Sequence, residues 1–393
     1  MNEPASGGSR ALCLVLAAAM PALPVAAQNR VIDFPDVGGY QTLAVDLHTH
    51  SVFSDGLVWP VIRVQESERD GVSLFAVSEH LEFQPREADI PHPDRNRSFA
   101  VAAEWAGSTG SDVIVVNGAE ISRDMPPGHV NAVFLSDANA LLMDDAMEVF
   151  REANRQGAFV FWNHPNWIPQ RADGVARLTD MHRELIANGL LHGIEVANAL
   201  TYSAEALQIA LDYDLAILGV SDIHGLIDWD YDVHGGGHRT VTLVLAEERT
   251  AESIREALNA NRTAAWKDGE LIGREDVLVP LLEASVKVSE VGVRRGSVLT
   301  VKLVNRSGAS FELLSIGPQR FYDRAAVVNV PPHGTVELSV TGENRSDFEL
   351  SFAVLNAIVA PETHPTLRLA VEVPSSGGSV ALAAPLPVDD PAN

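Results

Sequence analysis

Short apolar runs rich in β-forming residues alternate with helical patterns over the first two thirds of the chain, and this alternation restricts the fold most strongly. The apolar runs cover residues 43–50, 73–80, 112–122, 129–135, 157–165, 193–198 and 215–224. The helical patterns cover residues 60–71, 144–157, 178–189 and 203–214. Strand and helix repeated this often predict an α/β domain, built as a barrel or a doubly wound sheet. A further strand at 238–246 and a helix at 251–261 are expected on the outside of this domain.

Nine imidazole and carboxylate side chains stand at or near the ends of these apolar runs. They are His48, His50, Asp55, His80, Glu120, His129, His164, Asp222 and His224. Residues two apart in a strand share a face, so His48 and His50 project together, and so do Asp222 and His224. The carboxyl ends of the strands form the ligand-binding face of a βα barrel. Only His129 begins its run, which leaves its direction of approach open. The whole set indicates a metal site.

The first 27 residues have the features of a secretory signal. Arg10 precedes the apolar stretch 11–25, and small residues stand just before Gln28. We expect cleavage there, with an uncleaved anchor as the alternative. No later segment approaches the roughly 18 apolar residues of a membrane span. The sequence therefore predicts a periplasmic or secreted protein without a membrane span after cleavage. Its single cysteine, Cys13, would be removed, so disulfides and thiolate ligands are excluded.

From about residue 276 the pattern changes to strands separated by turn residues. Such runs lie at 284–293, 297–308, 309–317, 324–342 and 347–360. They predict a small all-β, Ig-like sandwich over 276–374, after an α/β domain over 28–275. Its histidines, His333 and His364, are isolated and predicted to be ordinary loop residues. Binding of a partner or a glycan is one hypothesis for this domain. Residues 375–393 are rich in Pro, Gly and Ser and predict a flexible tail.

The acidic excess belongs to the first domain. Residues 28–275 carry 18 Lys and Arg against 39 Asp and Glu, whereas residues 276–374 carry 9 against 11. Long nucleic acids bind mainly through Lys and Arg on phosphates, so a long polyanion is an unfavourable partner for such a surface. The simpler interpretation of the charge is solubility.

The motifs around the nine residues resemble those of the PHP superfamily, named for the polymerase and histidinol phosphatase proteins. They are HTHSVFSDG (48–56), VSEH (77–80), GAEIS (118–122), GHVN (128–131), NHP (163–165) and SDIH (221–224). The resemblance implies a distorted (β/α)7 barrel over residues 43 to about 265, holding two or three divalent metal ions. Ligands without sulfur suit Zn²⁺, Mn²⁺ or Fe²⁺ and do not distinguish among them.

The resemblance also implies how the ligands are shared. One ion would be held by His48, His50, Glu120 and Asp222. A second would be held by Asp55, His80 and His224, and Glu120 would bridge to a third held by His129 and His164. Two positions vary from the family pattern without removing a ligand: Asp55 stands where some members have histidine, and Glu79 precedes His80 where many members have aspartate.

Three divalent ions would bring a charge of about +6, half offset by the three carboxylates, which favours a phosphate group over a neutral substrate. A metal-activated water would then be the nucleophile. Asp222, Glu120 and Arg123 are the predicted catalytic residues, and Arg123 is the first choice to clamp a phosphate because it lies between two ligands. Other cationic candidates are Arg86, His92, Arg95 and Arg97 in the insertion 82–100, and Arg171. Surface salt bridges are the alternative for each of them.

Several other aromatic and histidine residues call for simpler interpretations. Trp162 and Trp167 flank His164; Trp162 is predicted to pack in the barrel, and Trp167 is a candidate pocket wall. His182 and His192 are predicted to be structural. His234 and His238 lie in a glycine-rich segment and predict a mobile loop, at the pocket rim or away from it.

These observations lead to one main hypothesis and three alternatives. The main hypothesis is an exported metal-dependent phosphoesterase acting on small phosphomonoesters, nucleotides or short oligonucleotides. One alternative is a 5′-to-3′ exonuclease activity on nucleic acid, which the resembled family includes. A second is a noncatalytic metal-containing binding protein. A third keeps the metal hydrolase but changes the bond to a carboxylic ester or amide.

Overall fold

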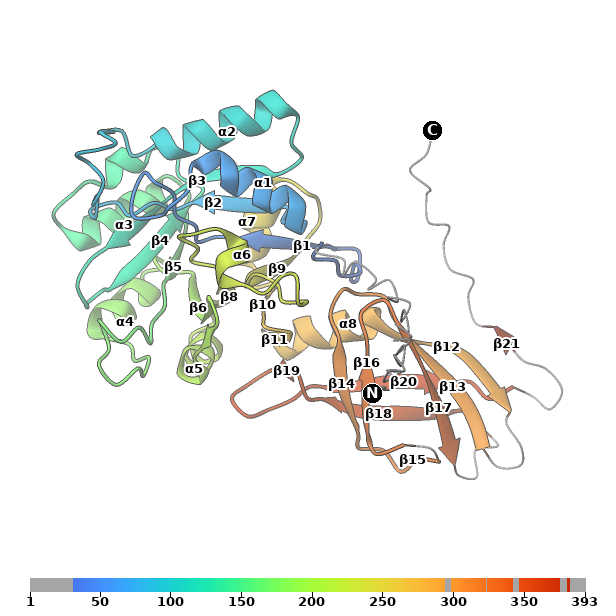
Figure 1. The fold of residues 1–393 in the computed structure, drawn as a ribbon. Coiled ribbons are helices and arrows are strands. Elements are labelled where there is room, and N and C mark those ends of the chain that lie inside the picture. The colour runs from blue at the N-terminus through green and yellow to red at the C-terminus, as the bar shows by residue number, and fades with distance from the viewer. Residues whose placement is uncertain (1–30, 294–297, 323, 342–345, 375–379, 382–393) are drawn as a thin grey trace, which may run out of the picture.

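The structure is a computed structural model that describes residues 31–293, 298–322, 324–341, 346–374 and 380–381. Figure 1 shows an α/β domain, coloured blue to yellow, beside an all-β domain coloured orange to red. The predicted signal at 1–27 lies outside the described residues, as does most of the predicted tail. None of the helices in the described part of the chain has the length and hydropathy that a membrane span needs.

A mixed sheet curled into a distorted barrel forms the centre of the first domain. Its strands are β1 (Gln41–Asp46), β2 (Leu74–Val77), β3 (Ile114–Ser122), β4 (His129–Val133), β5 (Phe159–Trp162), β6 (Gly193–Asn198), β7 (Thr201–Tyr202), β8 (Ala216–Val220), β9 (Val241–Ala246), β10 (Thr263–Lys267) and β11 (Glu270–Gly273). The helices are α1 (Pro60–Asp70), α2 (Arg97–Thr109), the 3₁₀ helix η1 (Ala138–Leu141), α3 (Ala146–Arg155), α4 (Asp180–Ala187), α5 (Ala204–Asp212), α6 (Ile227–Asp230), α7 (Ala251–Asn259) and α8 (Glu275–Ser285).

The strand order explains how distant motifs meet. Strands β1, β2 and β3 pair in parallel, as do β5, β6 and β8, while β4 joins the two groups by antiparallel pairs with β3 and β5. The chain just after β8 then meets the chain just after β1, because Asp222 N donates to His48 O at 3.0 Å and His50 N donates to Ile223 O at 3.0 Å. The first and last motifs are therefore neighbours.

Strand β9 departs from the sequence-based expectation. The sequence pattern predicts the run 238–246 on the outside, but β9 lies between β1 and β10 in antiparallel pairing, and all six of its residues are buried. An apolar run without polar alternation is buried on both faces and belongs in the middle of a sheet. Helix α7 follows it, and its buried residues pack into the barrel core.

The second domain is a sandwich of two antiparallel sheets. One has the order β15 (Arg320–Phe321), β17 (Thr335–Thr341), β13 (Val298–Asn305), β12 (Val286–Val293) and β21 (Val380–Ala381). The other has the order β16 (Val327–Val330), β14 (Phe311–Ser315), β18 (Phe348–Val354) and β20 (Thr366–Val371). The predicted tail differs from the expectation at β21, which pairs with β12. Outside β21, the tail lies beyond the described residues.

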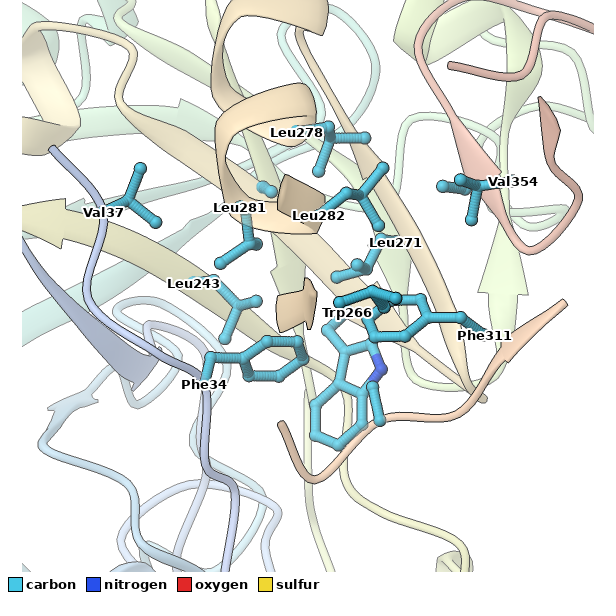
Figure 2. Packing of buried hydrophobic residues seen from close by; sticks show 14 of the residues in the cluster. Phe34, Val37, Leu243, Trp266, Leu271, Leu278, Leu281, Leu282, Phe311 and Val354 are labelled. Carbon is cyan, nitrogen blue, oxygen red and sulfur yellow. The ribbon is translucent and has the colours of Figure 1, made fainter. Parts of the chain in front are cut away.

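The two domains share one apolar core. Figure 2 shows Trp266 and Leu271 of the barrel and Leu278 and Leu282 of α8 beside Phe311 and Val354 of the sandwich, and all belong to a single buried cluster. Strand β19 (Ala357–Ile358), which follows β18, pairs in parallel with β11 of the barrel sheet. Burial of apolar surface therefore holds the domains together, and the barrel sheet receives a strand from the second domain.

Candidate metal centre

His48, His50, Glu120 and Asp222 place four donor atoms around one point. His48 Nε2 lies 3.2 Å from Asp222 Oδ1 and 3.4 Å from Glu120 Oε2. His50 Nε2 lies 3.1 Å and 3.4 Å from the same two oxygens. Donor atoms around a tetrahedral ion bound at about 2.1 Å are about 3.4 Å apart. His48, His50 and Glu120 are therefore close enough together to hold one divalent ion, and Asp222 Oδ1 lies beside both imidazole nitrogens.

Asp55, His80 and His224 form a second group beside the first. Asp55 Oδ2 lies 3.4 Å from His80 Nε2 and 3.2 Å from His224 Nε2. The His50 ring packs against the rings of both His80 and His224, with centroids 4.7 Å and 4.3 Å away. The donor atoms of these four residues lie close enough together to hold an ion.

Glu120 connects the first group to a third one. Its Oε2 faces His48 and His50, whereas its Oε1 lies 2.8 Å from His129 Nδ1 and 3.4 Å from His164 Nε2. The third group is brought together by the antiparallel pairing of β3 and β4, which sets His129 opposite Ser122 at the carboxyl end of β3. This pairing answers the open question about His129: an antiparallel strand begins where its neighbour ends.

Glu79 holds the loop that carries Asp55 through hydrogen bonds. The buried Glu79 carboxylate accepts hydrogen bonds from the Ser51 backbone N at 3.0 Å, from the Ser98 hydroxyl at 2.6 Å and from the Ser54 hydroxyl. The turn also requires glycine at Gly56, because a Cβ there would lie 2.6 Å from Ser51 N. Glutamate at position 79 thus orders the loop around a ligand.

Unpartnered buried atoms show that these residues fit metal ions. His48 Nε2 and Glu120 Oε2 are buried and form no hydrogen bond within the described part of the chain. Buried polar atoms are nearly always satisfied, and the exceptions mark functional positions. Imidazole nitrogens and carboxylate oxygens in this mixture are ligands for Zn²⁺, Mn²⁺ or Fe²⁺. The donor set and its geometry therefore suit divalent metals.

The charges of the site stabilise one another. Burial favours neutral Glu120, but His80 and His48 outweigh it and hold the pKa of Glu120 well below 4.5. Burial also opposes charge on His80, yet Glu120 and Asp55 raise the pKa of His80 to about 10. Burial lowers the pKa of His50 to about 4. Because ligand imidazoles must be deprotonated, metal binding has to release the proton that His80 otherwise holds.

Residues from all three groups line a cavity of about 490 Å³. Besides six of the metal-binding residues and Glu120, its wall contains Phe83, Ser122, Trp167 and Asn198. Neither Lys nor Arg is among these lining residues. The cavity is therefore acidic and aromatic, and apart from protonated histidines such as His80, positive charge in it has to come from bound ions.

Comparisons with known proteins show what this chain is similar to. A family model for an Ig-like domain matches residues 285–370. A solved structure of a two-domain protein from Bacteroides vulgatus, which contains a predicted PHP-like metal-dependent phosphoesterase, is 41% identical to this chain and has a TM-score of 0.81. The match covers 87% of this chain and 98% of that protein. This chain belongs to the PHP-like metal-dependent phosphoesterases.

Other structures resemble this phosphoesterase more weakly. A candidate metal-dependent phosphoesterase from Bifidobacterium adolescentis is 17% identical with a TM-score of 0.37, covering 56% of this chain and 96% of that one. PsfC from Pseudomonas syringae is 16% identical with a TM-score of 0.41, covering 58% and 92%. At these scores neither likeness supports an argument. The search of curated proteins found no match.

Arg123 of the phosphoesterase does not line the metal cavity. Its Nε lies 3.1 Å from Glu82 Oε1, and its terminal nitrogens donate to the carbonyl oxygens of Asp144 and Met143. It lines a separate neighbouring pocket with these residues. The guanidinium is therefore used in contacts within the protein, and its predicted role as a phosphate clamp finds no support in its surroundings.

Three of the remaining cationic candidates donate to backbone carbonyl oxygens of other residues. Arg86 donates to Gly56 O, Arg95 donates to Leu81 O at 3.0 Å, and Arg171 donates to Arg177 O at 2.5 Å. His92 stacks edge-on against Phe53, and Arg97 begins α2. The guanidinium groups of Arg86, Arg95 and Arg171 are therefore used in contacts within the protein.

The structure confirms Trp162 as a packing residue, fully buried and stacked on His182 at 4.0 Å. His182 also donates to Pro127 O, and His192 accepts from Val160 N, as expected of structural histidines. Trp167 lines the cavity, 5.1 Å from the His164 ring.

His238 contradicts the expectation of a mobile loop residue. Its ring stacks on Trp266 with centroids 3.4 Å apart, its Nδ1 donates to Arg239 O, and its Nε2 accepts from Gly269 N. This histidine is therefore fixed against β10, near the domain junction. His234 is exposed, and its mobility stays a prediction.

Sequence reasoning missed the residues that support the ligands. Glu195 accepts from His48 Nδ1, Asn198 donates to Asp222 Oδ2, and Asn163 donates to Glu120 Oε1. A signal for Glu195 was available, because it is a carboxylate inside the apolar run GIEVAN. Ser122, which lies 2.6 Å from His80 Nδ1, had no such signal.

Proposed function

We propose that this protein is an exported phosphoesterase that hydrolyses small phosphomonoesters, nucleotides or short oligonucleotides. One observation carries the proposal: the two oxygens of Glu120 face separate histidine groups at the floor of a single cavity. A carboxylate placed in this way suits a bridge between neighbouring divalent ions. Multi-ion sites of this kind stabilise the attacking and leaving oxygens of phosphoester hydrolysis.

The charge of the cavity supports a phosphate substrate only with ions in place. Its lining contains Asp55, Glu120 and Asp222 without Lys or Arg, in a protein of net charge −25. Three divalent ions would supply about +6 and leave the cavity floor positive. Phosphate binding should therefore depend on metal directly, whereas an arginine clamp would bind phosphate without metal.

The chain's own residues orient the site. Divalent ions, when bound, acidify a coordinated water toward neutral pH and polarise phosphoryl oxygens. Asn198 fixes Asp222 by donating to its Oδ2 at 3.1 Å, which leaves Oδ1 toward His48 and His50. Ser122 lies 2.6 Å from His80 Nδ1, and its hydroxyl donates to Glu120 O at 3.0 Å. Ser122 is thus used for orientation and is not free to act as a nucleophile.

The walls of the cavity favour an organic group with a ring. Phe83 and Trp167 are 52% and 42% exposed, and both line the cavity beside metal-binding histidines. Aromatic faces bind flat sugar or base rings through apolar contact. The volume of about 490 Å³ suits a small ligand. A nucleotide or a comparable ring-bearing phosphoester is therefore the substrate class we favour.

A substrate panel tests the proposal. The protein, loaded with Mn²⁺ or Zn²⁺, is assayed with p-nitrophenyl phosphate, nucleoside monophosphates, short oligonucleotides, a carboxylic ester and an amide. We expect phosphate release that is lost in Asp222→Asn and retained in Asp230→Asn, which removes an exposed carboxylate of the same domain. Metal-dependent binding without turnover would support a noncatalytic binding protein, and no release from any phosphoester with metal bound would overturn the proposal.

Export is the second part of the proposal and is supported by residues 1–27. Mass spectrometry of the protein from fractionated cells measures its N-terminus. We expect a chain that begins near Gln28 in the periplasmic or secreted fraction. A chain that keeps Arg10 in the cytosolic fraction would contradict export and leave the enzymatic proposal intact.

A further inference from the structure

Glu195 is a buried carboxylate that contacts two of the metal-binding residues and is linked to a third. Its Oε1 accepts from His48 Nδ1 at 2.7 Å, and its Oε2 accepts from the His164 backbone N at 2.6 Å. Asn198 donates to the same Oε2 at 2.9 Å and to Asp222 Oδ2 at 3.1 Å. One carboxylate thus connects residues that come from the ends of three strands.

A bulge in β6 puts Glu195 and Asn198 on the same side. Residues three apart in a regular strand point to opposite faces. The pairing of β6 with β8, however, shifts between Glu195 and Ala197, so that Val196 is an extra residue. The hydrogen bond between the two side chains confirms that both face the metal centre. Bulges beside functional sites redirect side chains in this manner.

The connected residues need external support because their backbones are strained. His164 has a φ of 25° and Asp222 a φ of 49°, in the left-handed region that residues with a Cβ avoid. Such conformations persist only where the surroundings determine them. Glu195 accepts the backbone N–H of His164 directly, and it holds the Asp222 side chain through Asn198.

We propose that Glu195 is a positioning residue that couples two metal positions. His48 and Asp222 would bind one ion together with His50, and Glu195 would orient both of these ligands. His164 would bind another ion together with His129, and Glu195 would orient it through its backbone N–H. By accepting the Nδ1 proton it also turns the His48 Nε2 lone pair toward the metal, where that atom is buried without another partner. The proposal depends on the metal centre and not on the substrate.

The chemistry at position 195 requires a carboxylate. Three N–H groups, from His48, His164 and Asn198, donate to its two oxygens. Glutamine has nearly the same shape but only one acceptor oxygen. In Glu195→Gln the amide NH₂ would therefore face at least one N–H group, and either His48 or the pair His164 and Asn198 would lose its acceptor.

Metal affinity measured by chelator competition tests this role, together with the visible absorption of the Co²⁺-loaded protein. Loss of an outer partner of a metal ligand typically weakens binding about 10–100-fold. We expect a loss of that size in Glu195→Gln at more than one site, with an altered Co²⁺ spectrum. The matched control is Asp70→Asn, a buried carboxylate of the same domain that pairs with Arg239. It should lower the melting temperature and leave metal affinity unchanged.

Asn198→Ala covers the case in which Glu195→Gln does not fold. It removes the link to Asp222 and leaves the Glu195 contacts with His48 and His164. We expect weaker binding at one metal position only, with the other unchanged. The proposal is overturned if folded Glu195→Gln binds metal as tightly as the unchanged protein, or if Asn198→Ala has unaltered affinity at every site. Absence of hydrolysis on all substrates would contradict the proposed activity without affecting this result.

Discussion

The metal centre and the domain junction bury opposite kinds of side chain, charged in the first and apolar in the second. The metal centre buries charged histidines and carboxylates, leaves His48 Nε2 and Glu120 Oε2 without hydrogen bonds, and holds His164 and Asp222 at positive φ. The junction buries apolar side chains such as Leu271, Leu282 and Phe311 (Figure 2), with regular strand pairing between β11 and β19. Unsatisfied polar atoms and strained backbone lower the stability of a fold, whereas apolar burial raises it.

This difference assigns separate tasks to the two regions. Stability of the whole chain should come from the junction, and metal affinity should come from the ligand end of the barrel. Variants in one region should therefore leave the property of the other nearly unchanged. The following predictions test this separation, from the largest expected effect to the smallest.

Glu120→Gln should have the largest effect, because Glu120 contributes donor atoms to more than one metal group. We expect metal affinity to fall by more than the roughly 100-fold that loss of an outer partner can cause. The melting temperature of the metal-free protein should change little, because the neighbouring imidazoles can lose their protons once the carboxylate charge is removed. Metal titration and thermal unfolding in chelator measure the two properties. A metal-free variant that unfolds many degrees earlier would show that Glu120 also stabilises the fold.

Trp266→Ala should produce the opposite result. The side chain packs edge-on against Phe34 at 5.1 Å and stacks on His238. Truncation of a buried Trp or Phe costs about 3–5 kcal/mol. We expect both domains to unfold earlier in urea, in a single transition, while the folded variant binds metal with unchanged affinity. Two well-separated transitions would show that the domains are stabilised independently.

His238 should make the junction sensitive to acid. Burial lowers the pKa of His238 to about 4, and its Nε2 must stay unprotonated to accept from Gly269 N. The unfolded residue titrates near 6.5, so its contribution is complete above pH 6.5 and is lost as the pH falls toward 4, by up to about 3 kcal/mol. The difference in unfolding free energy between the unchanged protein and His238→Phe, measured at pH 8 and pH 4.5, reports this loss. The prediction fails if that difference is the same at both pH values.

Asn356→Ala should have the smallest effect of the four. The Asn356 side chain donates to Gly269 O at 2.9 Å and to Ser310 O at 2.8 Å, and accepts from Glu312 N at 3.0 Å, which ties the barrel to the sandwich. Leaving such groups unsatisfied costs about 1–3 kcal/mol. The control is Asn259→Ala, whose exposed amide bonds only within its helix. Urea unfolding should separate the two variants, and equal stabilities would show that the junction does not depend on this amide.

The candidate ligands can be located from the sequence because each of them stands near a strand end and two pairs have a spacing of two, and the structure brings them close together. Position along a strand is local information, and the apolar runs mark it. Strand pairing is not local information. Strand β9 is central because it pairs with β1 and β10, and no feature within 238–246 predicts those partners. The same limit applies to His129, whose place depends on β4 running antiparallel to β3.

Side-chain partners are harder still to predict. Arg123 lies between two ligands in the sequence, but the carbonyl oxygens of Met143 and Asp144 and the carboxylate of Glu82 direct it away from the cavity. Glu195 reaches the metal centre together with Asn198 only because β6 contains a bulge, which depends on its register with β8. The glycine-rich appearance of 234–238 concealed the stacking of His238 on Trp266, a residue of a later strand.

The pairing of β19 with β11 has a consequence for the order in which the protein can be assembled. During synthesis, residues up to Gly273 emerge well before Ala357 and Ile358, so the barrel sheet at that stage ends in an open edge at β11. Open edges and uncovered apolar helix faces are prone to pairing with other chains. A fragment that stops after α8 would keep this edge and would be expected to aggregate. Completion of the catalytic half of the molecule therefore waits for the last third of the chain.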